Sequence, residues 1–170
     1  MFYRARQFWQ ALTIMPAAEE VERARQALSP QLMALFLNQR AGEQVHSLRV
    51  FINLCDQGEQ SPELLAAALL HDVGKSRYPL QLWERVAAVI GQAIAFVRTA
   101  SWSQAEPRGW KRPFVVARQH AAWGAEMAAA GGASPLTVEL IRRHHDPVAA
   151  SSVRPTDQLL QQLQIFDHRS

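Results

Sequence analysis

The sequence predicts an all-α protein, a single-domain helical bundle of about seven to nine helices. Apolar residues recur at helical spacing along most of the 170 residues, a pattern typical of helices that bury one face. A serine-proline pair precedes an apolar run at Ser29, Ser61 and Ser134, and this pair is a typical helix start. No alternating run, hairpin turn pair or internal repeat indicates a β-sheet.

The helices can be placed in order from these signals and from the glycines and prolines that end them. The segment 100–113 is expected to be a loop that interleaves aromatic and basic residues. Such a loop is either a substrate lid or a solvated loop anchored by its tryptophans. Helices are expected over 2–14, 17–28, 30–40, 42–57, 62–71, 80–90, 93–97 and 114–130, from Pro135 to the segment 142–147, and in a last helix that includes 159–166.

Composition indicates an ordinary globular chain, with 48% hydrophobic residues, 19% charged residues and a mean hydropathy of -0.15. This length fits one domain, in which a helical extension over 1–29 packs with a main part over 30–170. The single cysteine, Cys55, excludes an internal disulfide and any cysteine-based zinc site. A metal site would therefore be built from histidine, aspartate and glutamate.

The charge and hydropathy patterns indicate which partners and which cellular location to expect. The net charge is +3 without a long basic run, so no nucleic-acid partner is expected. The longest uncharged apolar run, 86–97, is too short for a membrane span. The N-terminus has no signal-peptide core. We therefore expect a cytoplasmic protein with no membrane span, and the sequence leaves its oligomeric state open.

The most informative stretch is an apolar helix that ends in His71, Asp72, Gly74 and Lys75. Neighbouring residues on a helix diverge by about 100°, so His71 and Asp72 can meet at one metal only near a helix end. The two oxygens of Asp72 could also bridge two metals. Gly74 suits the left-handed residue that closes a helix, and Lys75 could meet an anion. The alternative is a helix that simply ends in polar residues.

The histidines fall in a pattern that favours a metal site. His168 is expected in the C-terminal tail, whereas the other five lie on or at the ends of predicted helices. Helical bundles build metal sites from such inward-projecting side chains, although a lone histidine beside an apolar stripe is usually a hydrogen-bonded core residue. With two aspartates they give seven nitrogen and oxygen ligands, enough for two metals that share Asp72. The candidate ligands are His46, His71, Asp72, His120, His144, His145 and Asp167.

The order of these residues resembles that of the HD-domain superfamily of metal-dependent phosphohydrolases, and most closely its small HDIG-type proteins. The resemblance covers roughly residues 30–167 and implies an HD-like helical bundle. The matching pieces are His46-Ser-Leu-Arg49-Val50, Leu69-Leu-His71-Asp72-Val-Gly74-Lys75, His120-Ala-Ala-Trp-Gly124-Ala125, His144-His145 and Leu163-Gln-Ile-Phe-Asp167.

This resemblance implies a binuclear centre that hydrolyses a phosphate ester or anhydride with a metal-activated water. Asp72 and Lys75 would be catalytic, and Arg49 and Lys75 would bind the phosphate. The substrate would be a phosphorylated small molecule, nucleotide-like or cyclic-dinucleotide-like, and Mn, Fe, Mg, Ni, Zn and Co all remain open as the divalent metal. One metal would take His46, His71, Asp72 and Asp167, and the other Asp72, His120, His144 and His145, with Asp157 as a weaker rival for the role of Asp167.

Two departures keep the substrate open. The chain reads Asp146-Pro147-Val148 after His145, so it lacks the glycine-tyrosine-proline signature of cyclic-di-GMP phosphodiesterases. The glutamate-proline pair that follows the last aspartate of diadenosine tetraphosphate hydrolases is also missing. Two other functions fit the same pattern: a diiron oxygenase similar to inositol oxygenase, and a non-catalytic HD signalling module. The second histidine of His144-His145 argues against the oxygenase, and the complete ligand set argues against the module.

Overall fold

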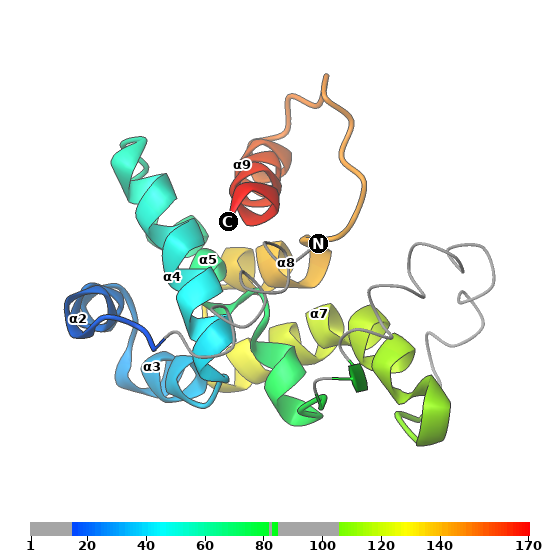
Figure 1. The fold of residues 1–170 in the computed structure, drawn as a ribbon. Coiled ribbons are helices and arrows are strands. Elements are labelled where there is room, and N and C mark those ends of the chain that lie inside the picture. The colour runs from blue at the N-terminus through cyan, green and yellow to red at the C-terminus, as the bar shows by residue number, and fades with distance from the viewer. Residues whose placement is uncertain (1–14, 82, 85–105) are drawn as a thin grey trace, which may run out of the picture.

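The fold is an all-α bundle, as the sequence predicts. The computed structural model describes residues 15–81, 83–84 and 106–170, and within them it contains seven α-helices and no strand (Figure 1). There are also two short 3-10 helices among these residues: η1 (Val73–Arg77) follows α5, and η3 (Gly109–Lys111) lies directly before α7. The α-helices are α2 (Ala18–Ala27), α3 (Pro30–Leu37), α4 (Ala41–Asp56), α5 (Pro62–Leu70), α7 (Arg112–Ala130), α8 (Pro135–Arg143) and α9 (Pro155–Arg169).

The three serine-proline pairs begin helices, which confirms that prediction. Ser29, Ser61 and Ser134 are the N-caps of α3, α5 and α8, with proline at the start of each helix. Each serine hydroxyl accepts a hydrogen bond from the backbone N–H three residues later, at 3.2–3.3 Å. These bonds satisfy one of the N–H groups that a helix start leaves without a partner.

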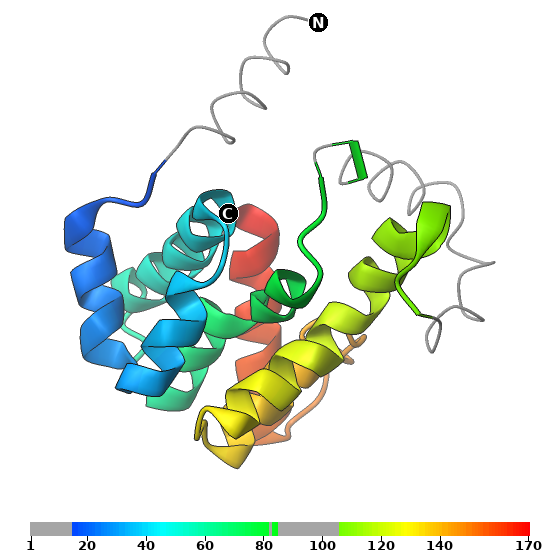
Figure 2. The same ribbon diagram turned by 90° about the horizontal axis from the view of Figure 1, so that it is seen from below.

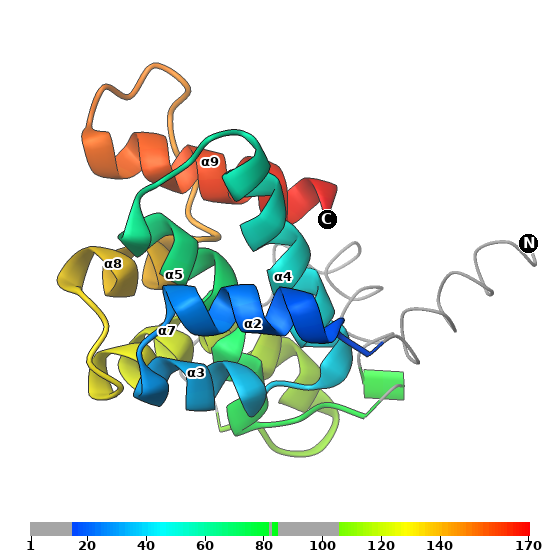
Figure 3. The same ribbon diagram turned by 90° about the vertical axis from the view of Figure 1, so that its left-hand side faces the viewer.

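Helix α5 lies at the centre of the bundle and contacts α2, α3, α4, α8 and α9. Residues 66–70 are all buried, as expected for a helix that is hydrophobic all round. In Figure 3, α2 crosses in front of α5, and α9 lies above α5 in the view. Because α5 is enclosed in this way, the polar residues that follow Leu70 emerge in the middle of the molecule.

The segment before residue 30 shares the main core. Ala24 and Leu28 are buried in the same hydrophobic cluster as Leu64 and Leu160. The expected division at residue 29 stays a prediction. Among the described residues, no helix is long and apolar enough to cross a membrane.

Two expectations about the elements need correction, and others are not tested. The segment 100–113 is not a loop throughout, because η3 occupies Gly109–Lys111 and α7 begins at Arg112. The last helix is longer than the apolar pattern indicates and includes His168, which therefore lies in α9 rather than in a tail. The helices expected over 2–14, 80–90 and 93–97, and the first part of the 100–113 segment, fall wholly or mostly outside the described residues.

Gly74 serves a close approach between two elements, not the left-handed turn that the sequence suggested. Positive φ angles occur at Gly58, Gly109 and Gly132 but not at Gly74. A Cβ atom on Gly74 would lie 1.9 Å from the His120 carbonyl oxygen and 2.6 Å from the Gly124 nitrogen. Figure 2 shows η1 beside α7, where this contact occurs. A Cβ atom on Gly124 would lie 3.1 Å from the Gly74 nitrogen, so both glycines contribute to this close approach.

Candidate metal centre

The polar residues after α5 lie where the helix ends, which lets adjacent side chains approach one site. His71 is the C-cap residue of α5, and Asp72 then leaves the helix with φ -98° and ψ 0°. Both residues are buried, with 1% and 5% of their surface exposed. Because Asp72 lies outside the α-helix, its side chain need not diverge from that of His71 by the roughly 100° that separates neighbours on a helix. The helix end therefore places an imidazole and a carboxylate together in the core.

A first group of ligand atoms joins three segments that are distant in the sequence. His46 comes from α4, His71 from the end of α5 and Asp167 from α9. Asp167 Oδ1 lies 2.9 Å from His46 Nε2 and 3.4 Å from His71 Nε2. The two histidine Nε2 atoms are 3.3 Å apart. Three nitrogen and oxygen donors therefore converge on one point.

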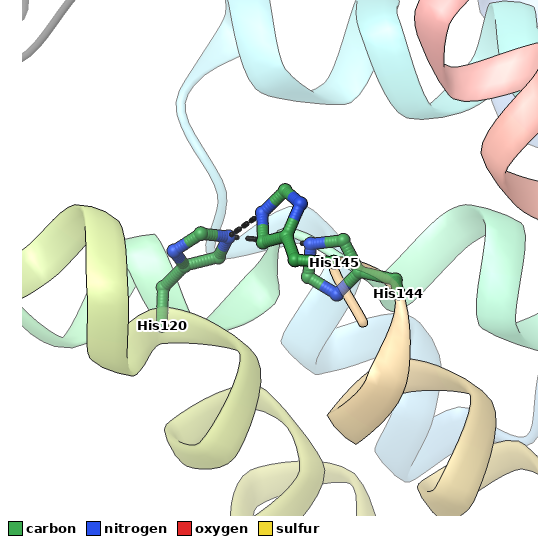
Figure 4. Close-up of side chains that lie close together, drawn as sticks. All are labelled: His120, His144 and His145. Carbon is green, nitrogen blue, oxygen red and sulfur yellow. Dashed lines mark hydrogen bonds between the residues drawn. The ribbon is translucent and has the colours of Figure 1, made fainter. Parts of the chain in front are cut away.

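A second group joins α7 to the end of α8. Figure 4 shows the ring of His120 from α7 facing the rings of His144 and His145. His120 Nε2 lies 3.3 Å from His144 Nε2 and 3.1 Å from His145 Nε2. One ligand atom from each of the three residues lies within 4.8 Å of those of the other two. The second group is therefore made of imidazole nitrogens alone.

Asp72 lies between the two groups. Its Oδ1 atom is 3.3 Å from His120 Nε2 in the second group, and its Oδ2 atom is 3.7 Å from His71 Nε2 in the first. The Lys75 ammonium also donates to Oδ2. One carboxylate thus presents a different oxygen to each group, which is the arrangement a bridging ligand needs.

Backbone hydrogen bonds fix which nitrogen of each buried histidine is available. The Nδ1 atoms of His71, His120 and His144 lie 2.9, 3.1 and 2.7 Å from the backbone oxygens of Ala68, Val116 and Ile141. A carbonyl only accepts, so we assign the N–H of each ring to Nδ1. Nε2 then carries a lone pair in the neutral ring, and histidine ligands of metals are typically oriented in this way.

The donor spacing fits a metal ion better than a purely protein network. His144 and His145 both direct Nε2 at His120 Nε2. With the N–H of His120 and His144 at Nδ1, neither ring has a proton on Nε2 to donate to the other, whereas two lone pairs can bind the same ion. Two ligands about 2.1 Å from one ion, at tetrahedral or octahedral angles, lie about 3.0–3.4 Å apart. The separations of 3.1–3.3 Å fall in this range.

The electrostatics favour the ligating forms of His144, His145 and Asp72. Burial lowers the pKa of His144 well below its usual value and lowers that of His145 to about 4. Against the effect of burial, Lys75 and His71 hold the pKa of Asp72 well below its usual value. Neutral imidazole and ionised carboxylate are the forms that bind metals. Against the effect of burial, Asp72 and Asp167 raise the pKa of His71.

The site is closed on one side and open on the other. His71, Asp72, His120 and His144 are buried, whereas His46 and Asp167 are partly exposed and His145 is exposed. A small molecule would therefore approach along the exposed members. Arg49 is exposed on α4, and no contact between Arg49 and the two groups is found among the described residues.

Asp157, the rival for the role of Asp167, belongs to a different network. It lies ten residues before Asp167 on α9, about 15 Å along the helix axis. Its carboxylate accepts hydrogen bonds from Ser152 Oγ at 2.6 Å, Arg154 Nε at 2.9 Å and Arg143 at 2.9 Å. Asp157 therefore ties the segment before α9 to the end of α8, and Asp167 is the aspartate that meets the histidines.

Replacing Asp157 by asparagine is expected to lower stability at neutral pH but not in acid. The Ser152 hydroxyl and the two arginines lower the pKa of Asp157 to about 2 from 3.8. A lowered folded-state pKa stabilises the fold above the unfolded value, and this contribution is lost as the pH falls from about 3.8 towards 2. Unfolding of parent and Asp157→Asn should therefore differ at pH 6, and the difference should shrink below pH 4. A difference that is independent of pH would contradict the role given to the ionised carboxylate.

The fold and the site together define a class: all-α helical proteins with a candidate metal centre. In this bundle, five histidines and two aspartates from distant helices lie together. A family model described as the HD domain matches residues 44–170, well over half of the chain. The protein therefore belongs to the HD-domain family, whose members are mostly metal-dependent phosphohydrolases and bind divalent metals. No curated protein matches the chain, and no solved structure matches it.

Sequence reasoning missed the residues that hold the ligands in place. The backbone oxygens of Ala68, Val116 and Ile141 accept from histidine rings, and each lies three or four residues before its histidine, so helical spacing could have indicated them. Gln164 contacts the backbone of the His144 segment from α9, and no local pattern marks it.

Proposed function

We propose that this protein is a metal-dependent phosphohydrolase that cleaves a phosphate ester or anhydride of a small molecule. The observation that carries the proposal is the position of Asp72, whose two oxygens face two separate groups of ligand atoms. Membership of the HD-domain family supports the reaction class. The donors are nitrogen and oxygen only, which suits several divalent metals, including Mn, Fe, Mg, Ni, Zn and Co.

The proposed ligand sets follow the two groups, with Asp72 shared between them. Divalent metals bound there would lower the pKa of a water and offset negative charge on the phosphoryl oxygens. The reaction forms a P–O bond from the water oxygen and breaks the P–O bond to the leaving group, which takes a proton. In the proposal, one ion is held by His46, His71, Asp72 and Asp167, and the other by Asp72, His120, His144 and His145.

Lys75 is the residue best placed to meet the phosphate. Its side chain is 35% exposed, and its ammonium already contacts Asp72 at the centre of the site. It could donate a charge-assisted hydrogen bond to a phosphoryl oxygen beside the bridging carboxylate. Arg49, three residues after His46 and exposed, is proposed as a second phosphate contact.

The proposal is tested by assaying the purified protein with phosphate monoesters, diesters and nucleotides. p-Nitrophenyl phosphate and bis(p-nitrophenyl) phosphate report on esters, and phosphate release reports on nucleotides. We expect hydrolysis that requires an added divalent metal and that stops with a chelator. Visible absorption with oxygen uptake would favour the diiron oxygenase. A protein that binds no metal and hydrolyses none of these compounds would favour the signalling module.

A further inference from the structure

Helix α9 contacts the segment after α8 through one row of polar side chains. Asp157, Gln161 and Gln164 lie four and three residues apart, hence on one face of α9. Asp157 accepts from Arg143 and Ser152, and Gln161 Nε2 donates to the Ala149 backbone oxygen at 2.8 Å. Gln164, at the end of this row, is the member that reaches the histidine pair.

Gln164 uses both N–H groups of its amide on the backbone around His145. Its Nε2 atom lies 3.1 Å from the His144 backbone oxygen and 2.7 Å from the Asp146 backbone oxygen. An amide nitrogen has two hydrogens, so both are used here. The last carbonyls of a helix lack partners within it, and α8 ends at Arg143. One side chain therefore fixes the backbone on both sides of His145.

His145 needs this support more than the other members of its group. The rings of His120 and His144 are each oriented by a hydrogen bond from Nδ1 to a backbone oxygen. Across the part of the chain that the structure describes, no such bond holds Nδ1 of His145. His145 as a whole residue is also exposed, whereas His120 and His144 are buried, so its surroundings restrain it less, although its ring lies against that of His144 with the centroids 3.8 Å apart. Besides these ring contacts, the position of His145 depends on its backbone, which Gln164 holds on both sides.

The same glutamine connects the two ligand groups. Gln164 lies three residues before Asp167 on α9, within one helical turn, and Asp167 belongs to the first group with His46 and His71. We propose that Gln164 is a positioning residue. It holds His145 at a fixed position relative to Asp167, so that the second metal is bound tightly. This inference rests on the proposed function, because it concerns the same two metals.

Replacing Gln164 by leucine should weaken binding of the second metal and spare the first. Leucine has a similar volume but no N–H groups, and Gln164 is only partly buried, so the fold should persist. Loss of a partner that orients a metal ligand typically weakens metal binding by about 10–100-fold. The measurement is Mn²⁺ bound per chain over a range of free Mn²⁺, with thermal unfolding of the metal-free protein as a check on folding.

The matched control is Gln161→Leu. Gln161 lies on the same helix and also donates to a backbone oxygen of the same segment, but at Ala149, away from the histidines. The Gln161→Leu variant should bind both ions as tightly as the parent. The His120→Ala variant should show how Mn²⁺ binding changes when the second ion is lost. If Gln164→Leu binds both ions as tightly as the parent, or if Gln161→Leu weakens binding equally, the positioning role is wrong. A parent that binds no Mn²⁺ would contradict the metal centre itself as well.

Discussion

Replacing Asp72 by alanine is expected to abolish hydrolysis and to weaken metal binding at both ligand groups. The change removes an oxygen that faces His120 and another that faces His71, together with one negative charge at the centre of the site. Loss of an orienting partner costs about 10–100-fold in metal affinity, and loss of a direct ligand should cost more. Asparagine would keep the shape, but it loses the charge, and its amide nitrogen is a donor that does not ligate. Metal content and hydrolysis are measured on both variants.

The control for Asp72 is His120→Ala, which alters only the second group. His120 Nε2 faces His144 and His145, and the first group is built from other residues. This variant should retain one ion per chain with strongly reduced hydrolysis, whereas Asp72→Ala should lose both. Thermal unfolding shows whether each variant is folded. If His120→Ala empties both groups, or if Asp72→Ala keeps two ions and its activity, Asp72 is not a bridge.

Replacing Gly74 by alanine is expected to destabilise the fold by about 3 kcal/mol or more, at the upper end of the usual cost of overpacking. The added Cβ would lie 1.9 Å from the His120 carbonyl oxygen and 2.6 Å from the Gly124 nitrogen. Both are backbone atoms of α7, so no side chain can turn away to make room. Any separation of η1 from α7 would also move Asp72 away from His120. Urea unfolding measures the stability, and metal content measures the effect on the site.

Gly131→Ala is the matched control for Gly74. Gly131 has an ordinary φ of -79°, and a Cβ there would meet the ends of the Leu32 and Leu35 side chains at 3.0 and 3.1 Å. Flexible side-chain ends can shift, so this variant should unfold close to the parent. Equal unfolding midpoints for Gly74→Ala and the parent would show that the contact between η1 and α7 is not tight.

The helix starts and the histidines and aspartates that come together in the candidate site could be predicted from the sequence because both depend on residue type and order. Serine before proline has a local physical reason to begin a helix, and it does so at Ser29, Ser61 and Ser134. The histidines lie at helix ends or on helix faces, so a bundle can bring them together. What the sequence could not give is which atoms meet, since this depends on how the helices pack.

Gly74, Asp157 and Gln164 show where local reasoning stops. A glycine after a helix predicts a left-handed turn, yet Gly74 is needed because another backbone lies against it. Asp157 and Asp167 are the same residue type on one helix, and only their position along α9 separates a structural ion pair from a candidate ligand. Gln164 has no ligand chemistry, so its contact with the histidine segment becomes visible only in three dimensions.

The most direct test of the bridged centre is the number of metal ions that the metal-free parent binds. The chain is stripped with a chelator, dialysed against Mn²⁺, and analysed for metal and protein by elemental analysis. Two groups that share Asp72 should take up two ions per chain, and hydrolysis of p-nitrophenyl phosphate esters or nucleotides should rise with the occupancy of both. A protein that stays folded and binds no ion, or only one at saturating Mn²⁺, would contradict the binuclear centre proposed for these residues.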